Sequence, residues 1–411
     1  MAIPSLAMIP SGYKDGKVYS VLPSNGDGDF TFSRGSNATR VNKDGFIETV
    51  TGDTPRLDYS DSSCPSLLLE PQRTNLVTYS KDFSNAAWTK QEINITANAA
   101  IAPDGTTTAD KVIPTAVATT HQVVSNAVIS STQCAFGVFA KADGYNTIEI
   151  LDRQIAANGA VFNLSTGSFT IIGTATATIE NYGNGWYRCT VVANTTGVRY
   201  YIPTSQGNFL GDGISGVYLW GASLEAGSYP TSYIPTNGAT ATRLADVCND
   251  AGTSDTFNDS EGVLMAEIKS ENNDVSVRQL SVSEGISDEV VKILFLDDNT
   301  VRFEMKTVIG TNFSKDLDLD IYSFNKFALK YKSNDYSVFV NGIKYSVSQT
   351  TSTPIGLNTL NFNSGNGGTP FYGNTKQIQY YNSALTDSEL EELTSWESFL
   401  DMANGQNYTI K

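Results

Sequence analysis

The residue types that catalysis uses most often are scarce in this sequence. His121 is the single histidine, so a Ser-His-Asp triad or a histidine-based zinc site would depend on it alone. It lies in Thr119–Val124, a strand-like run, which favours a structural or solvated imidazole over a catalytic one. The motifs His-Glu-x-x-His and Gly-x-Ser-x-Gly are absent. We therefore predict no catalytic residue and no enzymatic activity.

Two other patterns have the form of ligand sites. Asp316, Asp318 and Asp320 alternate with leucines, so in a strand their carboxylates would share one face. They could bind a cation, but the glycine and further ligands of an EF-hand loop do not follow, and a solvated strand face is favoured. Asp297-Asp298-Asn299 is interpreted first as a turn. The run Gly211–Gly216 matches Gly-x-Gly-x-x-Gly, but a strand follows where a dinucleotide site requires a helix. We expect no metal and no cofactor.

Aromatic residues are better candidates for a binding surface. A flat ring can stack on the C–H face of a sugar while a neighbouring Asn or Gln contacts its hydroxyls, and the alternative for each ring is packing in the core or at its rim. Six aromatic residues near turns or strand ends are the predicted glycan-binding residues: Trp88, Tyr200, Tyr201, Tyr372, Tyr380 and Tyr381. A cleaving site would need only two carboxylates a few ångströms apart, and 43 acidic residues do not exclude such a pair.

The strands that would position these residues are predicted to form a first sandwich over residues 76–237. The run from Gly216 to Glu225 is apolar on both faces, which is typical of a strand covered on both sides, and Pro230 and Pro235 follow it in an extended arm. Residues 175–182 and 186–193 flank a Gly-Asn-Gly turn, which predicts a hairpin.

A second sandwich is predicted over residues 258–394. Asn341-Gly342 lies between alternating runs, the strongest short hairpin signal. A two-residue loop would pair Val340 with Ile343, Val338 with Tyr345 and Tyr336 with Val347, all six on the core face. Before it, Phe327, Leu329 and Tyr331 alternate with lysines at 326, 330 and 332, which predicts a strand with one wet side.

A short helix should close this domain. Thr386 and Glu389 have the spacing of a capping box, and Leu385 and Leu390 have that of a hydrophobic staple. Leu393, Phe399 and Leu400 would continue the apolar stripe.

Composition supports an all-β protein and limits its partners. The chain has 411 residues, with 17% charged residues and a formal net charge of −16. The acidity opposes nucleic acid and anionic membrane surfaces. We expect no signal peptide, because the first ten residues lack a basic region and contain two prolines, and no run reaches membrane-spanning length. Its four cysteines include no Cys-x-x-Cys pair, so reduced structural thiols are favoured over one or two disulfides.

Several stretches resemble bacteriophage tail-fibre and head-fibre proteins: 216–236, the leader-like runs 32–41 and 65–75, and 83–88 with 103–106. The region 76–237 is similar to jelly-roll carbohydrate-binding modules. The order of the Asn-Gly hairpin, Phe371-Tyr372-Gly373 and the run Tyr380–Thr386 before a Glu-rich helix resembles a concanavalin-A-like, laminin-G-like domain.

The resemblance implies two jelly-roll β-sandwich domains after an irregular N-terminal arm. The expected division is an anchoring arm at 1–75, sandwiches at 76–237 and 258–394, a linker at 238–257 that contains Cys248, and a helix end and tail at 395–411. The expected function is host adhesion by a virion fibre or spike, assembled in the host cytoplasm as a homo-oligomer, most simply a trimer. Its partners would be other virion proteins, through the arm, and a host-surface glycan. A glycan-cleaving depolymerase and a purely structural decoration protein are the alternatives.

Overall fold

The structure is a computed structural model that describes residues 2–153, 158–203, 208–271, 276–286, 288–296, 299–346 and 352–397. These residues form β-strands and one short helix, α1 (Asp387–Thr394), so the predicted all-β sandwich class is confirmed. The chain folds into two compact units: unit 1 comprises residues 1–35, 51–71 and 245–411, and unit 2 comprises residues 36–50 and 72–244. In the described part of the chain no helix is both long enough and apolar enough to cross a membrane.

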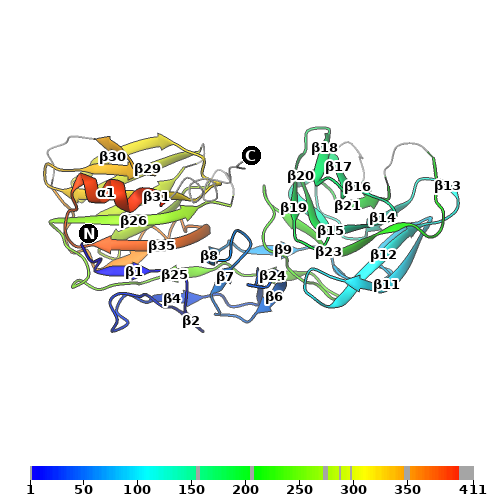
Figure 1. The fold of residues 1–411 in the computed structure, drawn as a ribbon, viewed down its shortest axis with the longest axis horizontal. Helices are drawn as coiled ribbons and strands as arrows, with labels where there is room; N and C mark the ends of the chain where they lie inside the picture. Colours follow the sequence, from blue (N-terminus) through cyan, green and yellow to red (C-terminus); the bar gives the residue numbers. More distant parts are fainter. Residues whose placement is uncertain are drawn as a thin grey trace. The chain divides into compact units, whose positions relative to one another are not determined.

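Unit 2 is a sandwich of two six-stranded antiparallel sheets (Figure 1). In order across the first sheet, the strands are β10 (Trp88–Gln91), β14 (Gln122–Ser125), β21 (Val198–Tyr201), β16 (Thr147–Asp152), β17 (Gly159–Asn163) and β18 (Ser168–Ile172). Those of the second are β11 (Ile93–Ile101), β12 (Thr107–Pro114), β23 (Gly216–Ala226), β15 (Thr132–Asp143), β20 (Trp186–Thr195) and β19 (Thr176–Asn181). Their inner faces enclose one apolar core, as alternating side chains of paired sheets do.

Three two-stranded pairs complete unit 2: β5 (Ala38–Val41) with β6 (Ile47–Val50), β9 (Arg73–Asn75) with β24 (Ala241–Arg243), and β13 (Ala118–Thr119) with β22 (Phe209–Leu210). The predicted hairpin is confirmed as β19 and β20. The prediction that 216–225 is covered on both faces is confirmed too, because Leu219 packs in the main core and Trp220 in a second cluster on the other side of the sheet.

Unit 1 is also a sandwich, with its core between a large and a smaller antiparallel sheet. The large sheet runs β33 (Ile343–Ser346), β32 (Ser337–Val340), β31 (Asn325–Lys332), β26 (Glu261–Lys269), β35 (Gly373–Tyr381), β8 (Ser66–Leu69) and β7 (Arg56–Asp58), and β1 (Leu6–Met8) also pairs with β35. The smaller sheet runs β30 (Gly310–Asp318), β29 (Thr300–Thr307), β28 (Val290–Phe295), β27 (Arg278–Ser283) and β34 (Thr359–Asn361). A third sheet runs β2 (Tyr13–Lys14), β3 (Lys17–Val18), β4 (Phe30–Ser33) and β25 (Val247–Asn249).

The N-terminal segment is not the irregular arm that we expected. Leu6 pairs with Tyr380, and Leu67 pairs with Thr375, so β1 and β8 both extend the large sheet along β35. Leu6 and Leu67 are fully buried in the unit 1 core. The short apolar runs of this segment are sufficient because each is buried against strands more than 300 residues away.

The stretch 238–257 is likewise not a free linker. It contributes β24 to unit 2 and β25 to unit 1, and Cys248 is buried opposite Phe32 in the unit 1 core. All four cysteines are free thiols, with Cys64 exposed and the other three buried.

The Asn-Gly hairpin forms with the predicted register, and Tyr336, Val338, Val340 and Tyr345 lie on the core face as predicted. Val340 pairs with Ile343 and Val338 pairs with Tyr345. Val338 lies in the core, but Ile343 is 57% exposed, because β33 is the edge strand of its sheet. The predicted partner Val347 lies outside the described residues.

The closing helix covers the sheet face that we expected to be wet. The capping box at Thr386 is present as predicted, and Leu385 and Leu390 pack on Phe339 in a small cluster. Beneath the helix, Lys330 is only 3% exposed and pairs with Asp335 and Asp387. The helix ends at Thr394, and Phe399 and Leu400 lie outside the described residues.

Candidate functional site

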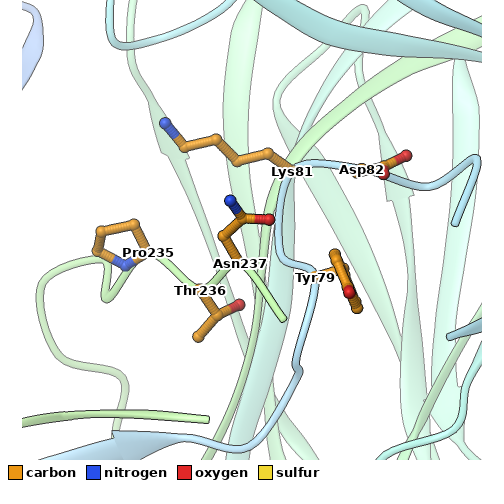
Figure 2. Close-up of a pocket in the computed structure, with 6 residues that line it drawn as sticks. All are labelled: Tyr79, Lys81, Asp82, Pro235, Thr236 and Asn237. Carbon is orange, nitrogen blue, oxygen red and sulfur yellow. The ribbon is translucent and has the colours of Figure 1, made fainter. Parts of the chain in front are cut away.

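A pocket of about 360 Å³ opens in unit 2 where two loop segments meet (Figure 2). One wall comes from the segment before β10, with Tyr79, Lys81 and Asp82, and the other from the arm after β23, residues 235–237. The backbones of Tyr79 and Asn237 form an antiparallel bridge, so these two residues are direct neighbours. In Figure 2 the Asn237 amide lies between Tyr79 and Pro235, on the same side as Lys81.

A network of buried hydrogen bonds behind the pocket joins the segment before β10 to the arm after β23. The Ser80 amide donates to Thr236 Oγ1 at 3.0 Å, and the Thr236 amide donates to Ser80 Oγ at 2.9 Å. Ser80 Oγ also lies 2.7 Å from the Tyr233 hydroxyl, whose pKa is raised by burial. The indole nitrogen of Trp88 donates to the Tyr79 carbonyl at 2.9 Å. Both walls therefore rest on buried groups, which fix the two segments against each other.

The charges at the pocket are largely paired. Lys81 Nζ lies 2.9 Å from Asp104 Oδ2 and 4.9 Å from the centroid of the Trp220 ring. Asp82 Oδ1 accepts hydrogen bonds from the Ser84 amide and hydroxyl at 3.0 and 2.5 Å. One ammonium and two carboxylates leave a formal net charge of −1.

The pocket has the chemistry of a binding site. Its lining offers the aromatic ring of Tyr79, the exposed carboxamide of Asn237 and the charged groups of Lys81 and Asp82. Such a mixture of an apolar surface with a few polar groups is typical of small-molecule sites. Neither a cysteine nor a histidine lines it.

The three predicted glycan-binding aromatics of unit 2 are core residues. Trp88 and Tyr200 are at most 1% exposed and pack with Phe83. Burial raises the pKa of Tyr200, and its hydroxyl donates to the Gly137 carbonyl at 2.9 Å. Tyr201 is 7% exposed, with Arg199 Nη1 donating to its hydroxyl at 3.1 Å. These three rings lie near strand ends, but their side chains are buried. The prediction that they lie at the surface was therefore wrong.

Two of the three predicted aromatics of unit 1 are also buried, and the third, Tyr372, remains a predicted glycan-binding residue. Tyr380 is fully buried, and burial raises its pKa to about 12. Tyr381 is 2% exposed and packs with the residues beneath the helix. Tyr372 is half-buried against the core. The structure brings none of the six predicted residues to the pocket lining.

His121 is structural, the first of the two predicted alternatives, although it lies between β13 and β14 and not within a strand. It is 1% exposed, and its ring nitrogens Nδ1 and Nε2 lie 2.7 and 3.0 Å from the carbonyl oxygens of Glu92 and Phe209. The imidazole thus joins two backbone segments.

The acidic and glycine-rich patterns also follow the structural interpretation. Asp316 forms two 2.7 Å hydrogen bonds with Arg302 on the exposed face of β30, and the Asp320 carboxylate accepts from the Tyr322 amide. No group of three or more metal-ligating side chains occurs among the described residues. Gly211–Gly216 is a turn that leads into β23, and Asp297 and Asp298 lie outside the described residues.

Sequence reasoning missed the pocket residues because they belong to loops. Tyr79 and Asn237 have no periodic context, and the two segments lie some 150 residues apart in the sequence. The one available signal was the pair of Tyr229 and Tyr233 in the arm after β23, and both are buried.

Comparisons with known proteins identify no family. No protein-family model and no curated protein matches the sequence. Among solved structures, the carbohydrate-binding module CBM40 of the Ruminococcus gnavus IT-sialidase, bound to α2,3-sialyllactose, is 19% identical, with a TM-score of 0.31, 35% of this chain covered and 92% of that chain. The NanB sialidase of Streptococcus pneumoniae is 15% identical, with a TM-score of 0.29, 34% of this chain covered and 25% of that chain. Domains LG4-5 of the mouse laminin α1 chain are 10% identical, with a TM-score of 0.25, 66% of this chain covered and 89% of that chain.

Proposed function

We propose that this protein is a non-catalytic glycan-binding protein displayed on a bacteriophage virion, as a head or tail fibre or spike. The observation that carries glycan binding is the pocket formed by Tyr79, Lys81, Asp82 and residues 235–237 of unit 2. The virion assignment rests on the resemblance of the sequence to fibre proteins. Attachment to other virion proteins through the N-terminal segment, homo-oligomeric assembly and synthesis in the host cytoplasm are parts of the same proposal.

The pocket residues suit one sugar unit at the end of a chain or in a branch. The Tyr79 ring supplies a surface for the C–H face of the sugar. The Asn237 carboxamide can both donate to and accept from hydroxyl groups. The local formal charge of −1 and the acidity of the whole chain disfavour a strongly anionic sugar, so the proposed ligand is a neutral or amino sugar.

Cleavage of the glycan is not supported by this arrangement. Asp82 Oδ1 is engaged by the turn that follows it, and Asp104 is engaged by Lys81 and by the Thr106 amide. A general acid or nucleophile would have to give up these bonds to reach a glycosidic oxygen. Binding at single sites should be weak, and several copies on one particle would convert weak sites into firm attachment.

The test is a glycan array combined with an assay for new reducing ends on host envelope material. We expect binding by bead-clustered protein and no release of reducing ends. Tyr79→Ala should weaken binding roughly tenfold, which corresponds to losing about 1.4 kcal/mol, and Asn237→Ala provides a second variant at an exposed position. Tyr322→Ala, at an exposed tyrosine of unit 1, is the control.

Each outcome separates the candidate functions. Release of reducing ends would identify the depolymerase. Absence of binding, even by bead-clustered protein, would leave a purely structural decoration protein as the remaining candidate function. Binding that survives both pocket variants would place the glycan elsewhere on the surface and contradict the proposed site.

A further inference from the structure

Strand β18 is an edge strand of the first six-stranded sheet of unit 2, and its outer edge is suited to pairing with another strand. It pairs with β17 along its inner edge in an uninterrupted register, from Gly159 opposite Ile172 to Asn163 opposite Ser168 (Figure 1). In the part of the chain that the structure describes, no strand pairs with its outer edge. Such an edge presents a row of backbone N–H and C=O groups that can extend the sheet.

The other three edge strands of the unit 2 sandwich carry features that discourage such pairing. β10 contains the charged Lys90, and β19 contains Glu180, which is exposed. β11 is interrupted by a register shift between Thr96 and Ala100, with Asn98 in the left-handed region at φ 52°. Charges and bulges are the usual means of blocking edge-to-edge association, and β18 has neither.

The side chains of β18 also suit a second strand. Phe169 and Ile171 point to one face and are 39% and 46% exposed. From Gln154 to Ile179 the sequence has no charged residue. In a chain of net charge −16, most surfaces of two copies repel each other, and this strand is a place where they do not.

We propose that β18 pairs antiparallel with β18 of a second copy across a two-fold axis at Thr170. In this register Thr170 faces its own equivalent, and Phe169 faces Ile171 of the second copy, twice. Aromatic–β-branched and Thr–Thr pairs are among the favourable cross-strand combinations. A two-fold contact of this kind is self-complementary and closes the assembly, and it joins the two six-stranded sheets into one.

The oligomeric state of the full-length protein tests the contact. Light scattering over micromolar to submillimolar concentrations should show a monomer–dimer equilibrium. Thr170→Lys places two like charges directly opposite each other and should weaken the dimer by at least about tenfold. Thr178→Lys, at an exposed threonine of edge strand β19, is the matched control and should leave the dimer unchanged.

Cross-linking provides a second readout, which can trap a dimer that is only weakly populated. Directly opposed strand residues have Cα atoms about 4.5–5.5 Å apart, within the range of about 4.4–6.8 Å that a disulfide requires. In a Cys64→Ser background, which removes the exposed thiol, Thr170→Cys should form a covalent dimer under mild oxidation. Thr178→Cys should not.

Three results would overturn the proposal. The first is a parent protein that stays monomeric at every concentration, with no faster cross-linking at position 170 than at 178. The second is a dimer that Thr170→Lys leaves intact. The third is a trimer, as the fibre resemblance predicts, that persists with Thr170→Lys, because it would have to use another surface.

Discussion

The two units share one plan, two antiparallel sheets around an apolar core, but they are assembled from the chain differently. Unit 2 takes nearly all of its strands from the continuous stretch 72–244, whereas unit 1 combines three separated stretches. Unit 1 contains a buried ion network that links all three. Arg34 Nη1 lies 2.9 Å from Asp246, and Arg56 pairs with both Asp246 and Glu70. All four side chains are at most 5% exposed.

The network shows what holds a discontinuous unit in register. Burial alone would lower the pKa of Arg56, but Asp246 and Glu70 outweigh it and raise that pKa above its ordinary value. The Glu70 amide also donates to Asp246 Oδ2 at 2.8 Å. An apolar strand can be buried in several registers, but a buried charge is stable only beside its partner. We infer that the network specifies which segments meet in unit 1.

The largest expected effect is a charge placed in the unit 1 core. Val338 is fully buried, so Val338→Asp should destabilise unit 1 by several kcal/mol, roughly 4–7. Calorimetry should show that the unit 1 transition is lost while that of unit 2 remains. Ile343→Asp, on the partner strand but 57% exposed, is the control. A loss of both transitions would mean that the two units do not melt independently.

The next largest effect separates buried from exposed ion pairs within unit 1. Asp246→Ala leaves Arg34 and Arg56 with one carboxylate fewer, and should cost about 3–5 kcal/mol. Asp316→Ala breaks the exposed pair with Arg302 and should cost no more than about 1 kcal/mol. Urea unfolding of the two variants measures the difference. Equal losses would show that the network does not have the stabilising role inferred here.

Features set by neighbouring residues could be predicted from the sequence, whereas pairings between distant segments could not. The turn at Gly183–Gly185, the Asn341-Gly342 hairpin and the Thr386 cap are local signals, and all three form as predicted. The pairings of β1 with β35 and of β25 with β4 join segments more than 200 residues apart. No local pattern encodes such a partner, so residues 1–75 and 238–257 were wrongly interpreted as an arm and a linker.

The candidate site was less predictable than the fold. Residue type alone does not distinguish the buried Tyr200 from the half-buried Tyr79, because both follow short polar or mixed runs. The difference arises from tertiary packing. Tyr200 lies on a central strand of its sheet, whereas Tyr79 lies on a loop against Asn237.

A smaller effect tests this distinction in unit 2. Tyr200→Phe removes the hydroxyl that donates to the Gly137 carbonyl and should cost about 1–3 kcal/mol. Only the unit 2 transition should move, and glycan binding at temperatures well below that transition should be unchanged. Tyr322→Phe, at an exposed position of unit 1, is the control. If the folded Tyr200→Phe variant lost glycan binding, the original prediction that Tyr200 takes part in binding would be supported.

The smallest effect compares one carboxylate of each unit. In unit 2, hydrogen bonds from Ser215 and the Ile214 amide lower the pKa of Asp212 to about 2. In unit 1, Lys344 and Lys330 lower the pKa of Asp387 below its ordinary value. Both carboxyls have folded-state pKa values below their unfolded ones. Each therefore contributes stability above about pH 4, and that contribution is lost as the pH falls through the folded value.

Salt should separate these two carboxylates, because it screens exposed ion pairs more than it weakens hydrogen bonds within a turn. Carboxyl NMR titrations at low and at molar salt should show the pKa of Asp387 rising toward its ordinary value while that of Asp212 changes little. Lys344→Met should mimic the effect of salt on Asp387, and Ser215→Ala should raise the pKa of Asp212 at either salt concentration. Equal salt responses would mean that both carboxylates are held by the same kind of interaction. In that case the two exposed carboxylates would not differ. Only the buried network of Arg34, Arg56, Glu70 and Asp246 would then distinguish unit 1, with its long-range ion pairs, from unit 2.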